Sequence, residues 1–286
     1  ITRGGLSKKT LNIAMAGTGV GKSLFMCHHA SSVLAEGMNV LYITMEMAEE
    51  KISERIDANL LNLGMDEIKV IDHGIFSKRI NKIKDTNKGK LIVKEYPTGS
   101  AHAGHFRALL EELKMKKGFK PDIIFIDYLN ICASQRLKMG SNVNTYSYIK
   151  SIAEELRGLA VEYNCPLVSA TQTTRGGYNN TDVGLEDTSE SFGLPATADL
   201  MFAIIASEEL DNMGQWMIKQ LKNRYSDPNY YKRFVVGVDK NKMRLYNVES
   251  SAQTNIMDAG QEEKDVGAVF DKSEAGERMN LEGFKV

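Results

Sequence analysis

The sequence predicts an α/β fold with a mostly parallel, twisted sheet, helices on both faces and antiparallel strands at one border. Between residues 11 and 205, short aliphatic runs alternate with longer stretches of helical period. Nearly continuous apolar strands separated by helices are typical of a parallel sheet covered on both faces. Three further strand-like runs follow with no helix between them, which predicts the antiparallel border.

Each element is predicted from a local pattern. The parallel strands are aliphatic runs bounded by polar or turn-forming residues, at 11–15, 39–44, 90–94, 123–126, 166–170 and 200–205. Apolar residues at helical spacing predict the intervening helices near residues 22–36, 47–63, 102–117 and 146–164. The antiparallel strands are predicted at residues 215–221, 233–238 and 243–248.

Composition divides the chain into a domain over residues 1–250 and an acidic tail over residues 251–286. The tail holds eight acidic and four basic residues, and its scattered apolar residues are typical of a disordered segment. The domain holds 32 basic and 29 acidic residues, which excludes a nucleic-acid binder that depends on bulk positive charge. The chain begins with Ile1 and not with Met, and it has no signal-peptide pattern at its start. We therefore expect it to be part of a longer polypeptide.

The cysteines and the apolar runs indicate the cellular compartment in which the protein works. Cys27, Cys132 and Cys165 each lie in an apolar segment without metal-ligand spacing. This pattern predicts a reducing, cytoplasmic compartment and neither a disulfide framework nor a zinc site. The longest apolar run has seven residues, far fewer than the ~20 that a membrane-spanning helix needs. We therefore expect no membrane association.

A glycine-rich segment between the first strand and the first helix predicts a phosphate site. It fits the P-loop pattern except that Ala16 occupies the first Gly position, and it comprises Ala16, Gly17, Thr18, Gly19, Val20, Gly21, Lys22 and Ser23. Backbone N–H groups at a helix N-terminus bind anions. Lys22 would neutralise the β- and γ-phosphates and the Ser23 hydroxyl would bind Mg²⁺, so the expected ligands are ATP (or GTP) and Mg²⁺.

Two acidic residues are expected at the same sheet edge. Asp127 follows the fourth strand, where a carboxylate can hold Mg²⁺ beside the phosphates; a simple turn residue is the alternative. Glu46 follows the second strand and is the candidate base for hydrolysis. Its alternative is an acidic residue in the first turn of the next helix, where the helix dipole favours negative charge.

Taken in order, these motifs resemble replicative hexameric helicases of the DnaB type, whose motor domain has the RecA-like P-loop NTPase fold. The phage version that works beside a separate primase is the most similar. The resemblance covers about residues 4–250 and includes Gly4-Gly5-Leu6, Met45-Glu46-Met47 with Arg55, Asp127-Tyr128-Leu129, the segment from Ile152 to Arg175, Asp187 to Asp199, and Lys222-Asn223-Arg224.

The resemblance implies roles for individual residues. Glu46 would be the catalytic base, Asp127 the Walker B carboxylate and Gln172 the sensor of the γ-phosphate. Lys222 and Arg224 would reach across a subunit interface as lysine and arginine fingers, and as alternating strand residues both point to one face. In a monomer, the same two side chains would usually be solvated charges on an edge strand.

Two polar loops, Asn130 to Thr145 and Arg175 to Glu190, are predicted to leave the same sheet edge. Polar loops of ~16 residues tend to be functional, with disordered surface as the alternative. Phosphate contacts are expected from Arg136, Lys138 and Arg175 and from the backbone of Gly176 and Gly177. The resemblance adds a DNA-facing segment with Ser189, Glu190, Ser191, Phe192 and Gly193, although Ser189 replaces an Arg of many bacterial members and Phe192-Gly193 also differ.

The resemblance implies an NTP-driven replicative DNA helicase that translocates 5′–3′ on single-stranded DNA as a ring-shaped homohexamer. A primase and a helicase loader are the expected partners in a primosome. The family's N-terminal domain is not contained in these 286 residues. A RecA-like strand-pairing filament that uses ATP as an assembly switch is the rival hypothesis, and a regulatory ATP-driven scaffold is a third. Glu46 and the Lys222-Asn223-Arg224 motif favour the helicase.

Overall fold

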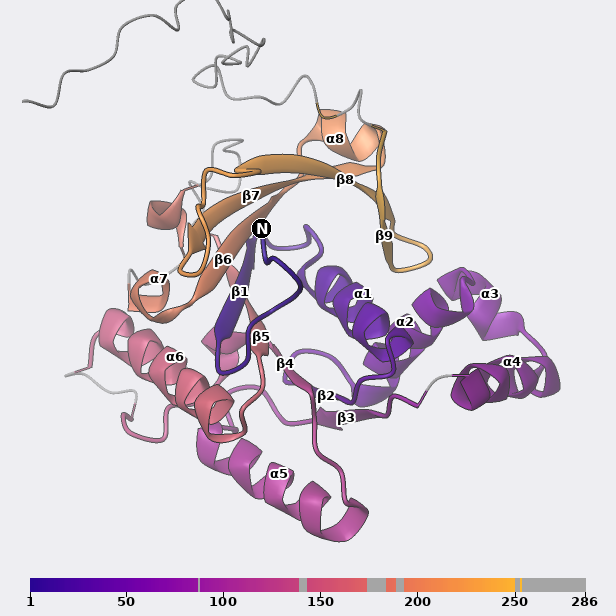
Figure 1. Ribbon diagram of the computed structural model, residues 1–286, viewed down its shortest axis with the longest axis horizontal. Helices are drawn as coiled ribbons and strands as arrows, with labels where there is room; N and C mark the ends of the chain where they lie inside the picture. The colour runs from indigo at the N-terminus through magenta and orange to yellow at the C-terminus, as the bar shows by residue number, and fades with distance from the viewer. Residues whose placement is uncertain (87, 139–142, 174–183, 189–192, 250–252, 254–286) are drawn as a thin grey trace, which may run out of the picture.

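The computed structural model describes residues 1–86, 88–138, 143–173, 184–188, 193–249 and 253 (Figure 1). Within them, one sheet of nine strands has the order β3-β2-β4-β5-β1-β6-β7-β8-β9. The strands are β1 (Leu11–Ala16), β2 (Val40–Thr44), β3 (Leu91–Glu95), β4 (Ile123–Asp127), β5 (Leu167–Gln172), β6 (Leu200–Ile205), β7 (Gln215–Asn223), β8 (Arg233–Asp239) and β9 (Arg244–Asn247). The tail expected over residues 251–286 lies outside the described residues except for Gln253.

The strand directions confirm the predicted fold class. β1 to β6 pair in parallel, and β6 to β9 pair antiparallel at one border of the sheet. β7 lies between β6 and β8, but β8 pairs with it only over Gln215–Lys219. Among the described residues, Lys222 is therefore in the part of β7 that pairs on one side alone, with β6, and Arg224 follows the end of the strand.

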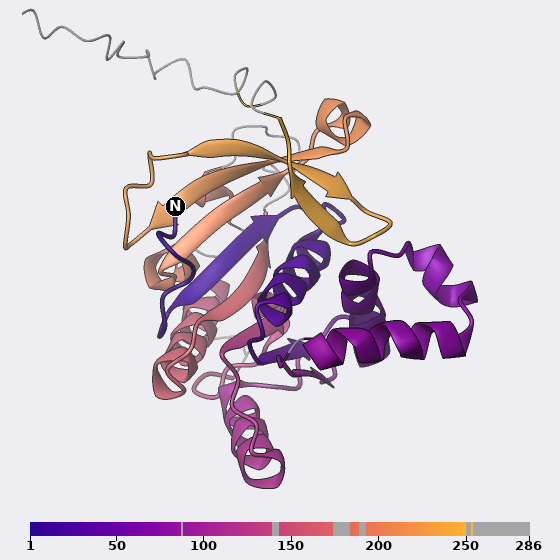
Figure 2. The ribbon, with the colours of Figure 1, turned by 45° about the vertical axis from the view of Figure 1, so that its right-hand side comes forward.

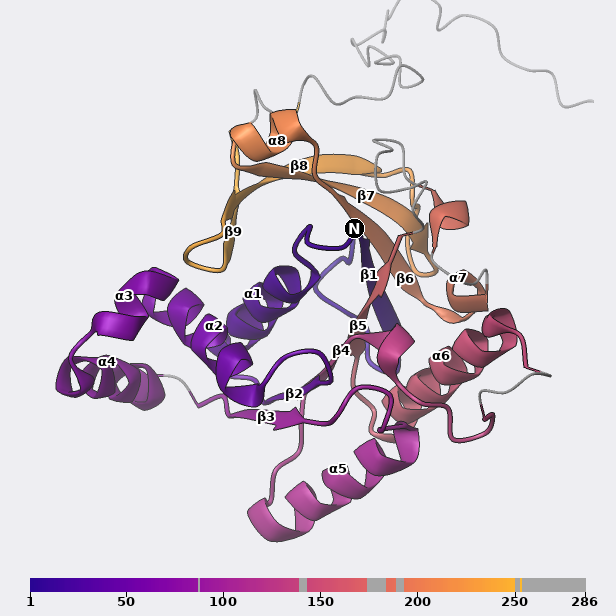
Figure 3. The ribbon, with the colours of Figure 1, turned by 180° about the vertical axis from the view of Figure 1, so that it is seen from behind.

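Helices cover both faces of the parallel strands (Figures 1 and 3). They are α1 (Lys22–Ala35), α2 (Glu49–Leu61), α3 (Met65–Val70), α4 (His73–Thr86), α5 (Ala103–Lys117), α6 (Thr145–Glu162), α7 (Gly193–Thr197) and α8 (Glu208–Asn212). Along β2, Leu41 and Ile43 pack in the core under α5 and α6, whereas Val40 and Tyr42 pack under α1 and α2. The alternation follows from the two-residue period of a strand.

Helices α3 and α4 were not predicted from the sequence. Neither contains a buried residue. Helix α4 nevertheless carries Phe76, Ile80 and Ile83 at helical spacing, a signal that the sequence prediction did not use. Figure 2 shows both standing away from the sheet, beyond α2. Among the described residues, no helix combines the length and apolar character needed to cross a bilayer.

The antiparallel strands curve over the N-terminal end of α1 (Figure 1). Trp216 of β7 is completely buried there and packs in a cluster with Leu24 of α1, Ile204 and Val238. This cluster supports the first turn of α1, next to the glycine-rich segment.

Candidate active site

The glycine-rich segment forms the turn between β1 and α1, as predicted. Gly19 has φ of 77° and Gly21 has φ of 128°, in the region where a side chain causes strain. A Cβ on Gly21 would also overlap the ring of Trp216. The chain can therefore make this turn only with glycine at these points, and the turn leads directly into the N-terminus of a 14-residue helix. Such an end favours a bound anion.

Lys22 curls back over this turn. Its Nζ donates a hydrogen bond to the carbonyl oxygen of Gly17 at 3.3 Å and lies 5.6 Å from the ring centroid of Tyr128. The residue is only 7% exposed. Burial lowers the pKa of Lys22, while the charges of Glu46 and Asp127 raise it. A cation held in this position is suited to a phosphate group on the turn.

Asp127 ends β4 beside this cation and is fully buried. Its Oδ2 accepts a hydrogen bond from the Tyr42 hydroxyl at 2.9 Å, while its Oδ1 has no hydrogen-bond partner among the described residues. Burial raises the pKa of Asp127; the hydroxyls of Ser23 and Tyr42 and the charges of Lys22 and Arg55 lower it. A buried carboxylate oxygen without a partner is costly, so Asp127 and Ser23 fit a divalent cation. The alternative of a simple turn residue does not explain this burial.

Glu46 lies just beyond the end of β2, at the same sheet edge as Asp127. The N–H of Met45 donates to the carbonyl oxygen of Asp127 at 2.9 Å, which joins the two strand ends. Burial and the charge of Asp127 raise the pKa of Glu46, and Lys22 and Arg55 lower it. The first turn of α2 holds Glu49 and Glu50 instead. The alternative that Glu46 lies in that turn is therefore wrong.

Gln172 is the last residue of β5. The side chain of Tyr128 connects it to Lys22. Its Nε2 donates to the Tyr128 hydroxyl at 3.2 Å, and the same ring contacts Lys22. Sequence reasoning identified Gln172 but missed Tyr128 and Tyr42 as site residues. The only signal for Tyr128 was its position after Asp127, and Tyr42 resembles any other apolar strand residue.

The structure places Lys222 and Arg224 far from this cluster. Lys222 donates to the carbonyl oxygen of Pro195 at 2.6 Å. Arg224 forms an ion pair with Asp199 at 2.8 Å; the same fully buried carboxylate pairs with Arg157 at 3.0 Å. In the sheet, Lys222 lies opposite Met201, near the amino ends of the parallel strands. The glycine-rich turn over residues 16–23, which we call the phosphate turn, lies at their carboxyl ends.

Three of the residues expected to contact DNA are described. Arg136 already forms ion pairs within the chain, with Glu154 at 3.1 Å and Glu155 at 3.4 Å. Lys138 is exposed. Gly193 is buried at the start of α7, which does not support a phosphate contact by this residue. The other candidates lie outside the described residues: Arg175, Gly176, Gly177, Ser189, Glu190, Ser191 and Phe192.

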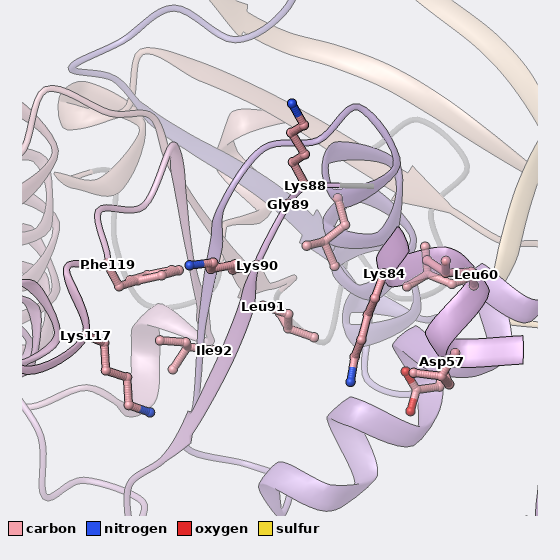
Figure 4. A pocket seen from close by; sticks show the side chains of 13 residues that line it. Asp57, Leu60, Lys84, Lys88, Gly89, Lys90, Leu91, Ile92, Lys117 and Phe119 are labelled. Carbon is pink, nitrogen blue, oxygen red and sulfur yellow. The ribbon is translucent and has the colours of Figure 1, made fainter. Parts of the chain in front are cut away.

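A cavity of about 600 Å³ lies between α2, α4 and β3 (Figure 4). Apolar side chains such as Leu60 and Leu91 line it together with Asp57 and several lysines. Burial raises the pKa of Asp57 to about 6, against a lowering effect of Lys84. No residue of the phosphate turn lines this cavity, so it is separate from the candidate active site.

The model of the "DnaB-like helicase C terminal domain" matches residues 2–230. A "DnaB-like replicative helicase" of Enterobacteria phage T4 is 47% identical over 255 residues, covering 88% of this chain and 54% of the relative. A "Replicative DNA helicase DnaB" of Helicobacter pylori is 24% identical, covering 69% of this chain and 40% of the relative. The chain thus spans about half the length, or less, of these curated relatives.

Solved structures have the same fold. One of them, described as an "ATPase Domain", superposes with a TM-score of 0.71 at 18% identity, covering 86% of this chain and 87% of that one. A structure titled "The Structure Of A DnaB-Like Replicative Helicase And Its Interactions With Primase" has a TM-score of 0.70 at 17% identity, covering 85% of this chain and 58% of that one.

Proposed function

Because the chain belongs to the family of DnaB-like helicase C-terminal domains, we propose that it is the nucleotide-hydrolysing motor of a replicative DNA helicase. One observation carries this proposal: a cation on the phosphate turn, Lys22, lies among the charges of two carboxylates, Asp127 and Glu46. The family match argues against the strand-pairing filament and the regulatory scaffold.

The proposed ligand is ATP or GTP with Mg²⁺. Lys22 and the backbone N–H groups of the turn would hold the phosphates. The Ser23 hydroxyl and Asp127 Oδ1 would hold the metal, since this oxygen is buried and has no hydrogen-bond partner in the described part of the chain. When bound, Mg²⁺ would neutralise negative charge that develops on the phosphates.

Glu46 is the proposed general base for the attacking water. A general base works best when its pKa lies near the working pH, and burial together with Asp127 raises the pKa of Glu46. Gln172 donates to the Tyr128 hydroxyl at the same edge and would contact the γ-phosphate.

We propose that the active assembly is a ring of six copies on single-stranded DNA. Lys222 and Arg224 lie at the opposite edge of the sheet from their own phosphate turn. In a ring built from one repeated head-to-tail contact, such residues can meet the neighbour's nucleotide. Lys138 and the two polar loops would contact the DNA backbone. We propose that the ring translocates 5′–3′ in the cytoplasm and that a primase and a helicase loader are its partners.

Nucleotide hydrolysis and strand separation test the proposal directly. Lys22→Ala should abolish both DNA-stimulated hydrolysis and unwinding of a forked duplex, because the phosphates lose the cation of the turn. Lys116→Ala is a matched control, since Lys116 is an exposed lysine paired with Glu112 on α5. Normal turnover in Lys22→Ala, or an equal loss in both variants, would contradict the assignment.

A further inference from the structure

A buried tyrosine hydroxyl lies directly behind the proposed metal carboxylate. Tyr42 is in the middle of β2 and is fully buried. Its hydroxyl donates to Asp127 Oδ2, across 85 residues of sequence, at 2.9 Å. We propose that Tyr42 is a positioning residue, which holds Oδ2 so that Oδ1 stays directed at the cation. This inference rests on the proposed function.

The position of the Tyr42 hydroxyl is determined by packing. Tyr42 and Phe125 are partners in the parallel pairing of β2 and β4, and their rings stack with centroids 5.7 Å apart at an interplanar angle of 14°. Residues on the same face, such as Val40 and Phe125, are purely apolar. Packing alone therefore does not require a hydroxyl here, and a buried phenol is costly unless it finds a partner.

The hydroxyl has a second neighbour on α1. Cys27 Sγ lies 4.0 Å from the Tyr42 oxygen, and burial raises the pKa of Cys27 to about 12, so it stays a thiol. Because an ionised carboxylate only accepts hydrogen bonds, the phenol donates to Asp127 and can accept from the thiol. Ser23 and Cys27 are four residues apart on one helix and so lie on the same helix face. Strand β2 and helix α1 thus approach the carboxylate together.

Asp127 has one other hydroxyl neighbour, Ser23, which also lowers the pKa of Asp127 and is the second proposed metal ligand. Oδ1 has no hydrogen-bond partner among the described residues, so the phenol's bond to Oδ2 is the contact that restrains the carboxylate from behind the metal site. Partners behind a metal ligand set its orientation, and their loss typically costs about 10–100-fold in metal affinity. If Tyr42 has this role, its hydroxyl affects the metal without affecting the nucleotide's other contacts.

Tyr42→Phe tests the role because it removes one oxygen and keeps the ring stack. Binding of a fluorescent nucleoside diphosphate is measured with EDTA and across a Mg²⁺ titration, and Mn²⁺ binding is followed by electron paramagnetic resonance. We expect the Mg²⁺ and Mn²⁺ concentrations at half-saturation to rise about 10–100-fold, with nucleotide affinity in EDTA unchanged.

Tyr148→Phe is the matched control. Tyr148 is also a buried tyrosine, at 8% exposure, and its hydroxyl accepts from the N–H of Ser134 on the α6 side of the sheet. This variant should leave the metal dependence unchanged, and thermal unfolding checks that both variants fold.

The outcomes separate this inference from the proposed function. Unchanged metal dependence in Tyr42→Phe overturns the positioning role, and so does an equal loss of affinity with and without metal, which would indicate a structural role alone. If the wild-type chain binds nucleotide without any effect of Mg²⁺, the proposed metal site itself is wrong.

Discussion

Replacing Arg224 by Ala distinguishes action within one chain from action on a neighbouring copy. Asn223, just before Arg224, lies opposite Leu200, which in turn lies opposite Asn12. From Asn12 to the start of the phosphate turn at Ala16, the strand rises about 13 Å, and crossing to β7 adds about 10 Å sideways. Arg224 is also held by Asp199 at 2.8 Å. Its side chain is too short to reach the phosphates of its own subunit.

The expected magnitude follows from the finger role proposed for Arg224 in a ring. An arginine finger contributes about 10³–10⁵-fold to turnover, so rings of Arg224→Ala or of Lys22→Ala alone should each be nearly inactive. In an equal mixture, an Arg224→Ala subunit supplies an intact phosphate turn, and a Lys22→Ala neighbour supplies the finger. Random assembly of a closed ring places these two in the required order at about a quarter of the sites. We therefore expect recovery of up to about a quarter of the wild-type rate if sites act independently.

The assay is steady-state phosphate release on single-stranded DNA as the ratio of the two variants is changed. Activity should rise to a maximum near equal amounts and fall to zero at either end. A Lys22→Ala/Arg224→Ala double variant is the control, because mixing it with either single variant restores no complete site. Inactive mixtures that native mass spectrometry shows to be co-assembled would refute action across the interface.

Three further outcomes are expected. Glu46→Gln should lower kcat by about 10²–10⁴-fold while equilibrium nucleotide binding is retained; weakened binding with unchanged kcat would exclude the base. A general base acts in its deprotonated form, and the pKa of Glu46 is raised above its ordinary value of 4.5. We therefore expect kcat to fall as the pH decreases, with the fall beginning at a pH above 4.5. Glu46→Gln should lack this loss at acid pH. Gly21→Ala should reduce the free energy of unfolding by about 2–4 kcal/mol through strain and overlap with Trp216, as measured by denaturant titration. Gly158→Ala, in open space on α6, should instead add about 0.5–1 kcal/mol.

Local patterns in the sequence were sufficient for much of the fold and for part of the site. The nine strands and the helices α1, α2, α5 and α6 agree with the predicted segments, because a buried strand or helix repeats its apolar residues at a fixed period. The phosphate turn was also predicted, since its glycines and Lys22 are contiguous. Asp127 and Glu46 were found because parallel strands bring their carboxyl ends to one edge. Helix α3 was missed because its six residues are too few to show a helical period, whereas the helical spacing of Phe76, Ile80 and Ile83 in α4 was a signal that was not used.

The contacts between distant segments were decided by the tertiary structure alone. The bond between Tyr42 and Asp127 joins residues 85 positions apart, and nothing near Tyr42 in the sequence indicates a polar partner. The buried carboxylate of Asp199 binds Arg157 of α6 and Arg224, which directly follows β7. The register of β6 with β7 places Arg224 at the amino edge of the sheet, opposite the phosphate turn. Register depends on side-chain packing between strands that are distant in the chain, so local sequence patterns do not contain it.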